Sequence, residues 1–232
     1  MKLEFTTTAC IRPELLDQTY TNLNQVLTDI NLKTEGTLYI NIDPVPNGSH
    51  LNIQKEIDTA KSHFKQVYYR IGEPGGNFSK AASWVLSQPK GEYFFNIEDD
   101  WEFIGQISAE DCITKINNHP QDNILQCILR HPFDNRAALI PSMFKTNTIQ
   151  SILQQYPIPE NENPERWLWE LKDPKKLTHY NITTTNSVQC IDRGRQWMIK
   201  HGYSKNQDRQ RINSKGQMQG NFTKWNLNND QP

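Results

Sequence analysis

The 232-residue sequence has little apolar material, since only 35% of its residues are hydrophobic. It contains no apolar run approaching the roughly 18 residues of a membrane-spanning helix. Its first residues also lack the basic and apolar regions of a secretory signal. We therefore expect an intracellular protein of the cytoplasm, or of the host cytoplasm if the protein is viral.

The motifs of several common site types are also missing. The four cysteines are far apart and form no C-x-x-C pair, so neither a zinc site nor a disulfide framework is predicted. No P-loop, G-x-G-x-x-G or G-x-S-x-G motif occurs. The six histidines are scattered without metal-ligand spacing. If a histidine completes a metal shell, His201 is the first candidate.

The length fits one well-buried domain and is too short for two of ordinary size. Residues 193–232 hold eight Lys or Arg and two Asp, a charge of +6, whereas residues 1–192 carry −7. We expect a folded domain over residues 1–203 and a basic, flexible tail over residues 204–232. The basic end is either a footprint for a polyanion such as DNA or a solvated tail.

Strands and helices are expected to alternate over the first hundred residues. The predicted strands are Leu3–Ala9, Thr37–Ile42, Gln66–Ile71 and Glu92–Ile97. Apolar residues from Leu15 to Ile30, residues 51–64 and residues 77–88 have helical spacing, with a glycine-rich loop over residues 72–76. This order predicts an α/β fold with a mostly parallel sheet flanked by helices.

Three consecutive carboxylates, Glu98, Asp99 and Asp100, end the aromatic strand. Like charges at this spacing repel unless a cation neutralises them. Ligands of open α/β sheets bind at the carboxyl ends of the strands, and Mg²⁺ or Mn²⁺ prefers carboxylate oxygen. The triplet is therefore predicted to clamp a metal–diphosphate, the alternative being an acidic turn that faces water.

Residues 91–101, read as Gly-Glu-Tyr-Phe-Phe-Asn-Ile-Glu-Asp-Asp-Trp, resemble the EDDW version of the D-x-D motif of GT-A fold glycosyltransferases. Residues 5–16 are similar to the first strand and nucleotide loop of that family. Residues 139–144, 163–167 and 192–205 look like later segments of its small viral and bacterial members. The resemblance covers about residues 3–205 and implies a GT-A-like, Rossmann-like fold.

The resemblance also implies roles for individual residues. Asp100 would bind Mn²⁺ or Mg²⁺ directly and Glu98 directly or through water. Asp99 would act in catalysis and in donor binding. The donor, a nucleotide-sugar and in particular a UDP-sugar, would meet these further residues: Thr7, Thr8, Arg12, Asp43, Asn77, Lys80 and Trp101.

An inverting enzyme also needs a carboxylate to take the acceptor's proton. Glu165 is the candidate, because Asn163-Pro164 predicts a helix start that places it in the first turn. The alternative is that Glu165 only complements the helix dipole. A retaining mechanism would not need this base.

The acceptor is open between DNA and a glycan. Arg193, Arg195 and Lys205 would contact acceptor or phosphate, which favours a 5-hydroxymethylpyrimidine in bacteriophage DNA, a form of DNA modification. Three other functions compete with sugar transfer. Residues 74–79 look like a loop of S-adenosylmethionine-dependent methyltransferases. A sugar nucleotidyltransferase would share a related fold, but residues 6–12 lack its glycine-rich loop. A non-catalytic carbohydrate- or DNA-binding module is the third.

Overall fold

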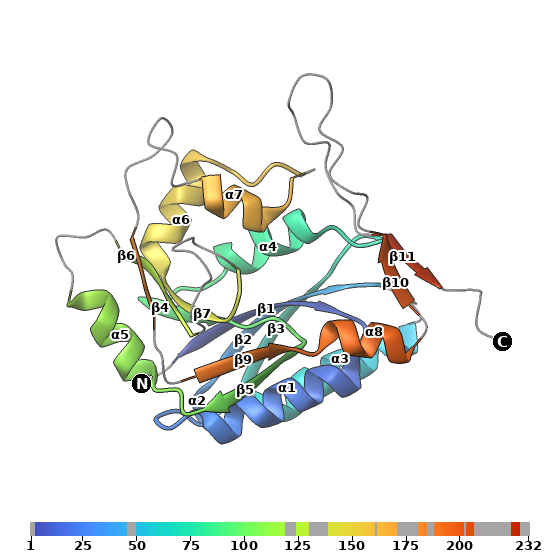
Figure 1. Ribbon diagram of the computed structural model, residues 1–232, viewed down its shortest axis with the longest axis horizontal. Helices are drawn as coiled ribbons and strands as arrows, with labels where there is room; N and C mark the ends of the chain where they lie inside the picture. The colour runs from blue at the N-terminus through green and yellow to red at the C-terminus, as the bar shows by residue number, and fades with distance from the viewer. Residues whose placement is uncertain are drawn as a thin grey trace.

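A seven-stranded sheet forms the centre of the molecule (Figure 1). The computed structural model describes residues 3–45, 50–118, 124–129, 139–160, 162–170, 181–184, 188–201, 203–206 and 224–227. In spatial order the strands are β3 (Gln66–Ile71), β2 (Thr37–Asp43), β1 (Glu4–Cys10), β4 (Tyr93–Asn96), β7 (Ser142–Lys145), β6 (Ile124–Ile128) and β8 (Asn181–Thr184).

The first half of this sheet is parallel and the second half is mixed. Strands β3, β2, β1 and β4 run parallel, and Glu4 of β1 lies between Thr37 of β2 and Phe94 of β4. Strand β7 pairs antiparallel with β4 and β6, and β6 pairs parallel with β8. The predicted α/β fold with a mostly parallel sheet is confirmed, and the four strands predicted from the sequence are its parallel half.

Helices cover both faces of the sheet (Figure 1). Helices α1 (Pro13–Val26) and α3 (His50–His63) pack on one face, and α4 (Phe78–Ser87), α6 (Thr146–Gln155) and α7 (Pro164–Glu170) pack on the other. The aromatic strand β4 contributes to both cores: Phe95 packs on the α1 side and Phe94 on the α4 side. A strand buried on both faces reads as a continuous apolar run, as β4 does.

The first helix ends earlier than its apolar pattern predicts. Helix α1 stops at Val26, and Leu27 is already extended. Backbone hydrogen bonds tie this segment to Ile107, whose N–H donates to the Val26 carbonyl over 2.9 Å. Leu27 and Ile30 are buried all the same, so their helical spacing reflects burial beyond the end of the helix.

The remaining elements lie around this core. They are α2 (Leu32–Glu35), β5 (Trp101–Gly105), α5 (Ala109–Asn117), β9 (Val188–Asp192), α8 (Gly194–Lys200), β10 (Tyr203–Asn206) and β11 (Lys224–Leu227). Strands β5 and β9 form an antiparallel ribbon, and so do β10 and β11. Strand β10 spans the predicted boundary at residue 203/204, and β11 lies inside the predicted tail. The rest of that tail is outside the described residues. None of the described helices has the length and apolar character to span a membrane.

Asn22 joins α1 to the β5–β9 ribbon. Its side-chain N–H donates to the Phe103 carbonyl over 3.1 Å, and its Oδ1 accepts from the Phe103 N–H over 2.6 Å. We expect Asn22→Ala to lower the free energy of unfolding by about 1–3 kcal/mol, because two backbone groups of β5 lose their partner. Urea unfolding measures the change. The control Gln25→Ala alters an exposed position of the same helix, and an equal loss in both variants would contradict the prediction.

Candidate active site

The candidate site lies where the neighbouring strands β1 and β4 end. Arg12 follows β1, and the triplet Glu98–Asp100 follows β4. Because the two strands are parallel and hydrogen-bonded to each other, their carboxyl ends open at the same edge of the sheet. The fold thus brings Arg12 next to a carboxylate triplet that follows it in sequence by more than eighty residues.

A buried ion pair between Arg12 and Asp99 forms the base of the site. The Arg12 Nε donates to Asp99 Oδ2 over 3.1 Å and its Nη2 donates to Asp99 Oδ1 over 2.6 Å. Both residues are buried, with 2% and 3% of their surface exposed. The Cys10 N–H also donates to Asp99 Oδ2, and the Thr19 hydroxyl donates to the Asp99 carbonyl. Burial and the Asp99 charge act in opposite directions on the Arg12 pKa, and the net effect raises it.

These contacts involve two residues with predicted roles. Arg12 and Asp99 were predicted to meet the donor, and Asp99 to act in catalysis. Their polar side-chain atoms bond to each other inside the protein, where they support the position of Asp100. Asp100 is less enclosed. One of its oxygens accepts from Arg12 Nη2 over 3.0 Å, and its side chain keeps 16% of its surface exposed.

The start of helix α8 packs directly against Asp100. The Arg193 N–H donates to the Asp100 carbonyl over 2.8 Å. A Cβ on Gly194 would lie 2.1 Å from Asp100 Oδ2 and 2.9 Å from Arg12 Nη1, so a side chain at this position would displace the Asp100 carboxylate. The C-terminal part of the chain therefore forms one wall of the carboxylate site.

Glu98 and Glu165 come from different elements and interact through their charges. Glu98 is half-buried and accepts a hydrogen bond from Trp101 Nε1 over 2.7 Å. Burial raises the pKa of Glu98 well above its ordinary value, and the charges of Asp100 and then Glu165 raise it further. The charge of Glu165, the predicted base, thus acts on the triplet. The Glu165 backbone N–H donates a hydrogen bond to Asn163 Oδ1 over 2.8 Å, which caps the start of α7.

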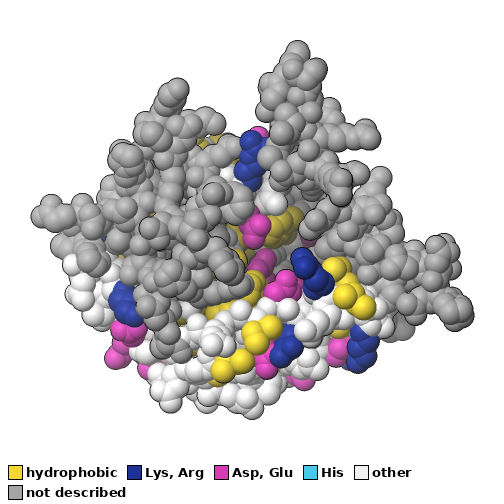
Figure 2. Space-filling view, in the orientation of Figure 1, with side chains coloured by type: hydrophobic (Ala, Val, Ile, Leu, Met, Phe, Trp, Pro, Cys, Tyr) yellow, Lys and Arg dark blue, Asp and Glu magenta, His cyan; other side chains and the backbone are white. Residues whose placement is uncertain are grey.

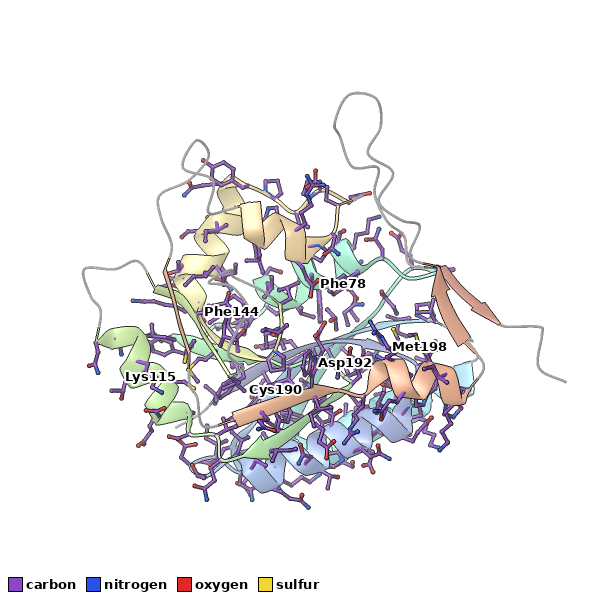
Figure 3. The ribbon with its side chains drawn as sticks, in the orientation of Figure 1. Phe78, Lys115, Phe144, Cys190, Asp192 and Met198 are labelled. Atoms are coloured by element: carbon purple, nitrogen blue, oxygen red, sulfur yellow. The ribbon has the colours of Figure 1, made fainter. Side chains whose placement is uncertain are left out.

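Figure 2 shows a hollow in the middle of this face, with acidic and hydrophobic side chains lining it. Phe78, at the start of α4, lies across this middle region from Asp192 and Met198 (Figure 3). Phe78 and Asp192 are exposed, whereas Met198 is half-buried. The hollow thus combines carboxylates with an exposed aromatic ring.

The predicted donor residues on β1 and β2 are mostly internal. Thr7 is fully buried and its hydroxyl accepts from the Tyr20 hydroxyl, so it belongs to the core, whereas Thr8 is half-buried. Asp43 is also buried, which raises its pKa. It accepts from the Asn77 N–H over 3.0 Å and from Asn41 Nδ2 over 2.9 Å. Asp43 therefore holds the loop before α4.

The remaining predicted contacts are scattered. Asn77 caps α4 by accepting from the Lys80 N–H. The Lys80 ammonium is bound to Glu73 at 2.7 Å and lies 3.4 Å from Glu160. The side chain of Lys205 lies outside the described residues.

The other predicted cations and the candidate histidine lie around α8. Arg193 pairs with Glu102, and Arg195 is exposed. The His201 ring stacks on Trp197, with centroids 4.3 Å apart. Trp101 is buried beside Glu98.

The carboxylates provide a limited ligand set for a metal ion. Among the residues that the structure describes, no group of three or more His, Cys, Asp or Glu side chains could hold a metal ion. A Mg²⁺ ion that also binds substrate phosphates uses one or two protein carboxylates. Asp100 and Glu98 fit that requirement, since both are partly exposed at the strand end, whereas Asp99 is enclosed by Arg12 and Cys10.

Sequence reasoning missed a second buried carboxylate, Glu56 of α3. Its Oε2 accepts from the Arg12 N–H over 3.1 Å, and its side chain is fully buried. Burial raises its pKa to about 9, with a smaller contribution from the charge of Asp99. The residue is therefore protonated at neutral pH. The sequence did contain a sign of this burial, because Glu56 lies on the apolar face of α3 that Ile53, Ile57 and Ala60 form.

The comparisons with known proteins concern the fold. Neither the protein-family models nor the curated proteins give a match to the chain. One similar structure is the mannosyltransferase PcManGT from Pyrobaculum calidifontis in complex with GDP-Man and Mn²⁺, with 11% identity and a TM-score of 0.55. Another is residues 1–349 of S. aureus TarS in complex with UDP, with 15% identity and a TM-score of 0.54.

The match covers 83% of this chain and 56% of the mannosyltransferase, and 81% of this chain and 59% of the TarS fragment. The chain thus spans little more than half the length of either. A putative glucose-1-phosphate thymidylyltransferase from Bacillus anthracis has 10% identity and a TM-score of 0.51, with 82% of this chain and 89% of that one covered. The chain therefore has the GT-A-like fold, which glycosyltransferases and nucleotidyltransferases share.

Removing the buried cation tests the support of the site. We expect Arg12→Met to lower the free energy of unfolding by about 3–5 kcal/mol, because Asp99 would remain buried without its partner. Urea unfolding measures this. The double variant Arg12→Met/Asp99→Leu should recover part of the loss, and the exposed control Arg195→Met should change stability little. A double variant less stable than Arg12→Met would contradict the pairing.

The state of Glu56 predicts a dependence of stability on pH. Its pKa is raised from 4.5 to about 9, so between these values the folded chain holds a proton that the unfolded chain has released. Stability should therefore fall as the pH rises through this window. Glu56→Gln removes this effect, and we expect it to raise the urea midpoint more at pH 8 than at pH 5. Glu110→Gln, at an exposed site, is the control. Equal midpoint shifts at both pH values would show that Glu56 is ionised in the fold.

Proposed function

We propose that the protein is a metal-dependent glycosyltransferase that moves a sugar from a nucleotide-sugar donor to a hydroxyl acceptor. The observation that carries this proposal is the carboxylate site at the ends of β1 and β4. There Arg12 pairs with the enclosed Asp99 and also holds Asp100. Trp101 holds Glu98, whose pKa is raised by burial and by the charges of Asp100 and Glu165. The GT-A-like fold supports the same reading, since donor-dependent glycosyltransferases share it.

Each carboxylate would have a separate task. Asp100, with Glu98, would hold Mn²⁺ or Mg²⁺ together with the donor's diphosphate. The bound ion would neutralise the negative charge that develops on the departing diphosphate. Arg12 holds Asp100 in position through Nη2 and so supports the ligand without facing the hollow.

Glu165 would act on the acceptor. A general base must lie within reach of the hydroxyl that attacks the sugar. Glu165 lies in the first turn of α7, and its charge acts on Glu98. This arrangement supports an inverting mechanism in which Glu165 removes the acceptor's proton while the triplet holds the donor.

The methyltransferase interpretation loses its main support. Its candidate loop includes Gly75 and Gly76, which have φ values of +89° and +73°. Gly76 packs against Asp43, which also accepts from the following Asn77 N–H. This loop is thus closed onto a protein carboxylate. Nucleotidyl transfer remains the second candidate, because the thymidylyltransferase from Bacillus anthracis shares the fold.

A donor-hydrolysis screen tests the proposal without knowledge of the acceptor. The protein is incubated with UDP-, GDP-, CMP- and dTDP-sugars and Mn²⁺ or Mg²⁺, and the released nucleotide is measured. We expect release from one donor, loss of release with EDTA, and a decrease on the order of 100-fold in Asp100→Asn, the range for losing one electrostatic stabiliser. Asp58→Asn, an exposed site on α3, is the matched control.

Three outcomes would contradict the proposal. Release that persists in both EDTA and Asp100→Asn would remove the metal and its ligand from the reaction. Formation of a nucleotide-sugar from a nucleoside triphosphate and a sugar phosphate would establish nucleotidyl transfer. Stabilisation of the fold against heat by S-adenosylmethionine, with none by any nucleotide-sugar, would restore the methyltransferase interpretation.

A further inference from the structure

A groove runs between α1, β5 and α8. Its volume is about 520 Å³, within the range of roughly 300–1,000 Å³ that is usual for ligand pockets. Helix α1 contributes Glu14 and Gln18, β5 contributes Trp101, and α8 contributes Gln196 and Lys200. Two of its lining residues already carry predicted contacts, Trp101 with the donor and Arg193 with acceptor or phosphate, but the groove as a whole has no assigned ligand.

The walls of the groove are held in place by internal contacts. Trp197 Nε1 donates to Glu14 Oε1 over 2.7 Å, which joins α8 to α1. The His201 ring stacks on Trp197, and its Nε2 lies 3.9 Å from Glu14 Oε1. Asn22 is fixed by its two bonds to Phe103. A ligand would thus meet a largely preformed surface, which lowers the entropy cost of binding.

The charges along the groove nearly cancel. It is lined by two carboxylates, Glu14 and Glu102, and two permanent cations, Arg193 and Lys200. Arg193 is paired with Glu102 and also donates to Gln196 Oε1 over 3.1 Å. A nucleic-acid backbone is attracted by Lys and Arg that neutralise phosphates, and carboxylates repel it. The part of the basic segment that lies here is therefore poorly suited to DNA.

The functional groups fit a ligand rich in hydroxyls. Side-chain amides such as Gln18 and Gln196 both donate and accept, carboxylates such as Glu14 accept, and Lys200 donates. A hydroxyl needs both kinds of partner. The half-buried Trp197 ring adds apolar surface for the C–H groups of a sugar ring. We propose that this groove binds a neutral glycan through one or two of its sugar units.

The groove adjoins the carboxylate site. Trp101 lines it and donates from Nε1 to Glu98. Arg193 also lines it, and its backbone N–H donates to the Asp100 carbonyl. A glycan seated here would extend from the outside of the β5–β9 ribbon to the edge of the catalytic hollow. The inference rests on the proposed function in one respect: it names the acceptor as a neutral glycan.

Affinity electrophoresis tests the groove without donor or metal. The protein migrates through native gels that contain dextran, mannan, xylan or a mixed-linkage β-glucan, and through gels that contain duplex DNA. We expect at least one neutral polysaccharide to retard the wild type. In the double variant Gln18→Ala/Gln196→Ala the apparent dissociation constant should rise at least fivefold. Gln54→Ala, an exposed glutamine on α3 outside the groove, should behave as wild type.

Every outcome bears on the proposal. Retardation by a polysaccharide that the double variant weakens supports it. The proposal would be overturned if only DNA retarded the protein or if no polysaccharide did. It would also be overturned if a polysaccharide retarded the wild type and the double variant equally. The single variant Gln18→Trp, which fills the groove, is a second test in case the double variant does not fold. Circular dichroism checks the folding of both variants. Failure of donor hydrolysis with intact glycan binding would refute the proposed function and leave the groove assignment standing.

Discussion

The candidate site depends on a guanidinium buried at the edge of a hydrophobic core. Arg12 is 2% exposed, and a charge in that position is tolerated only with partners that satisfy its donors. Asp99 supplies two oxygens, and Asp100 supplies a third. Because these partners follow β4 and Arg12 follows β1, the ion pair fixes how the two strand ends face each other.

The carboxylates of this network fall into two groups, those buried around Arg12 and those partly exposed to a ligand. Asp99 and the neutral Glu56 lie inside and hold the side chain and the backbone of Arg12. Asp100 and Glu98 lie at the boundary, where a ligand can reach them. Three adjacent acids would repel one another in water, but one of them is neutralised internally. Arg12 also pairs with Asp100, and both Asp100 and Glu98 keep part of their surface exposed at the strand end.

Much of the fold was predictable, because buried parallel strands and amphipathic helices leave clear patterns in the sequence. The place of the acidic triplet was predictable for the same reason, as it ends a continuous apolar strand. The role of each carboxylate was not. The resemblance implied a donor contact for Thr7 but carried no information on its burial, which arises because β1 is covered on both faces. The ion pair of Asp99 was not visible in the sequence, because its partner, Arg12, lies 87 residues away.

The contribution of α8 was the hardest to anticipate, and it connects both proposed ligand sites. Trp197 reaches Glu14 across 183 residues of sequence, and its ring lies 5.8 Å from the Arg12 guanidinium. A cation over an indole ring is stabilised by the ring's electron density. Gly194, one turn earlier, touches Asp100. Helix α8 therefore contacts the carboxylate site through Gly194 and lines the groove through Gln196, Trp197 and Lys200. One short helix thus forms a wall of both proposed ligand sites.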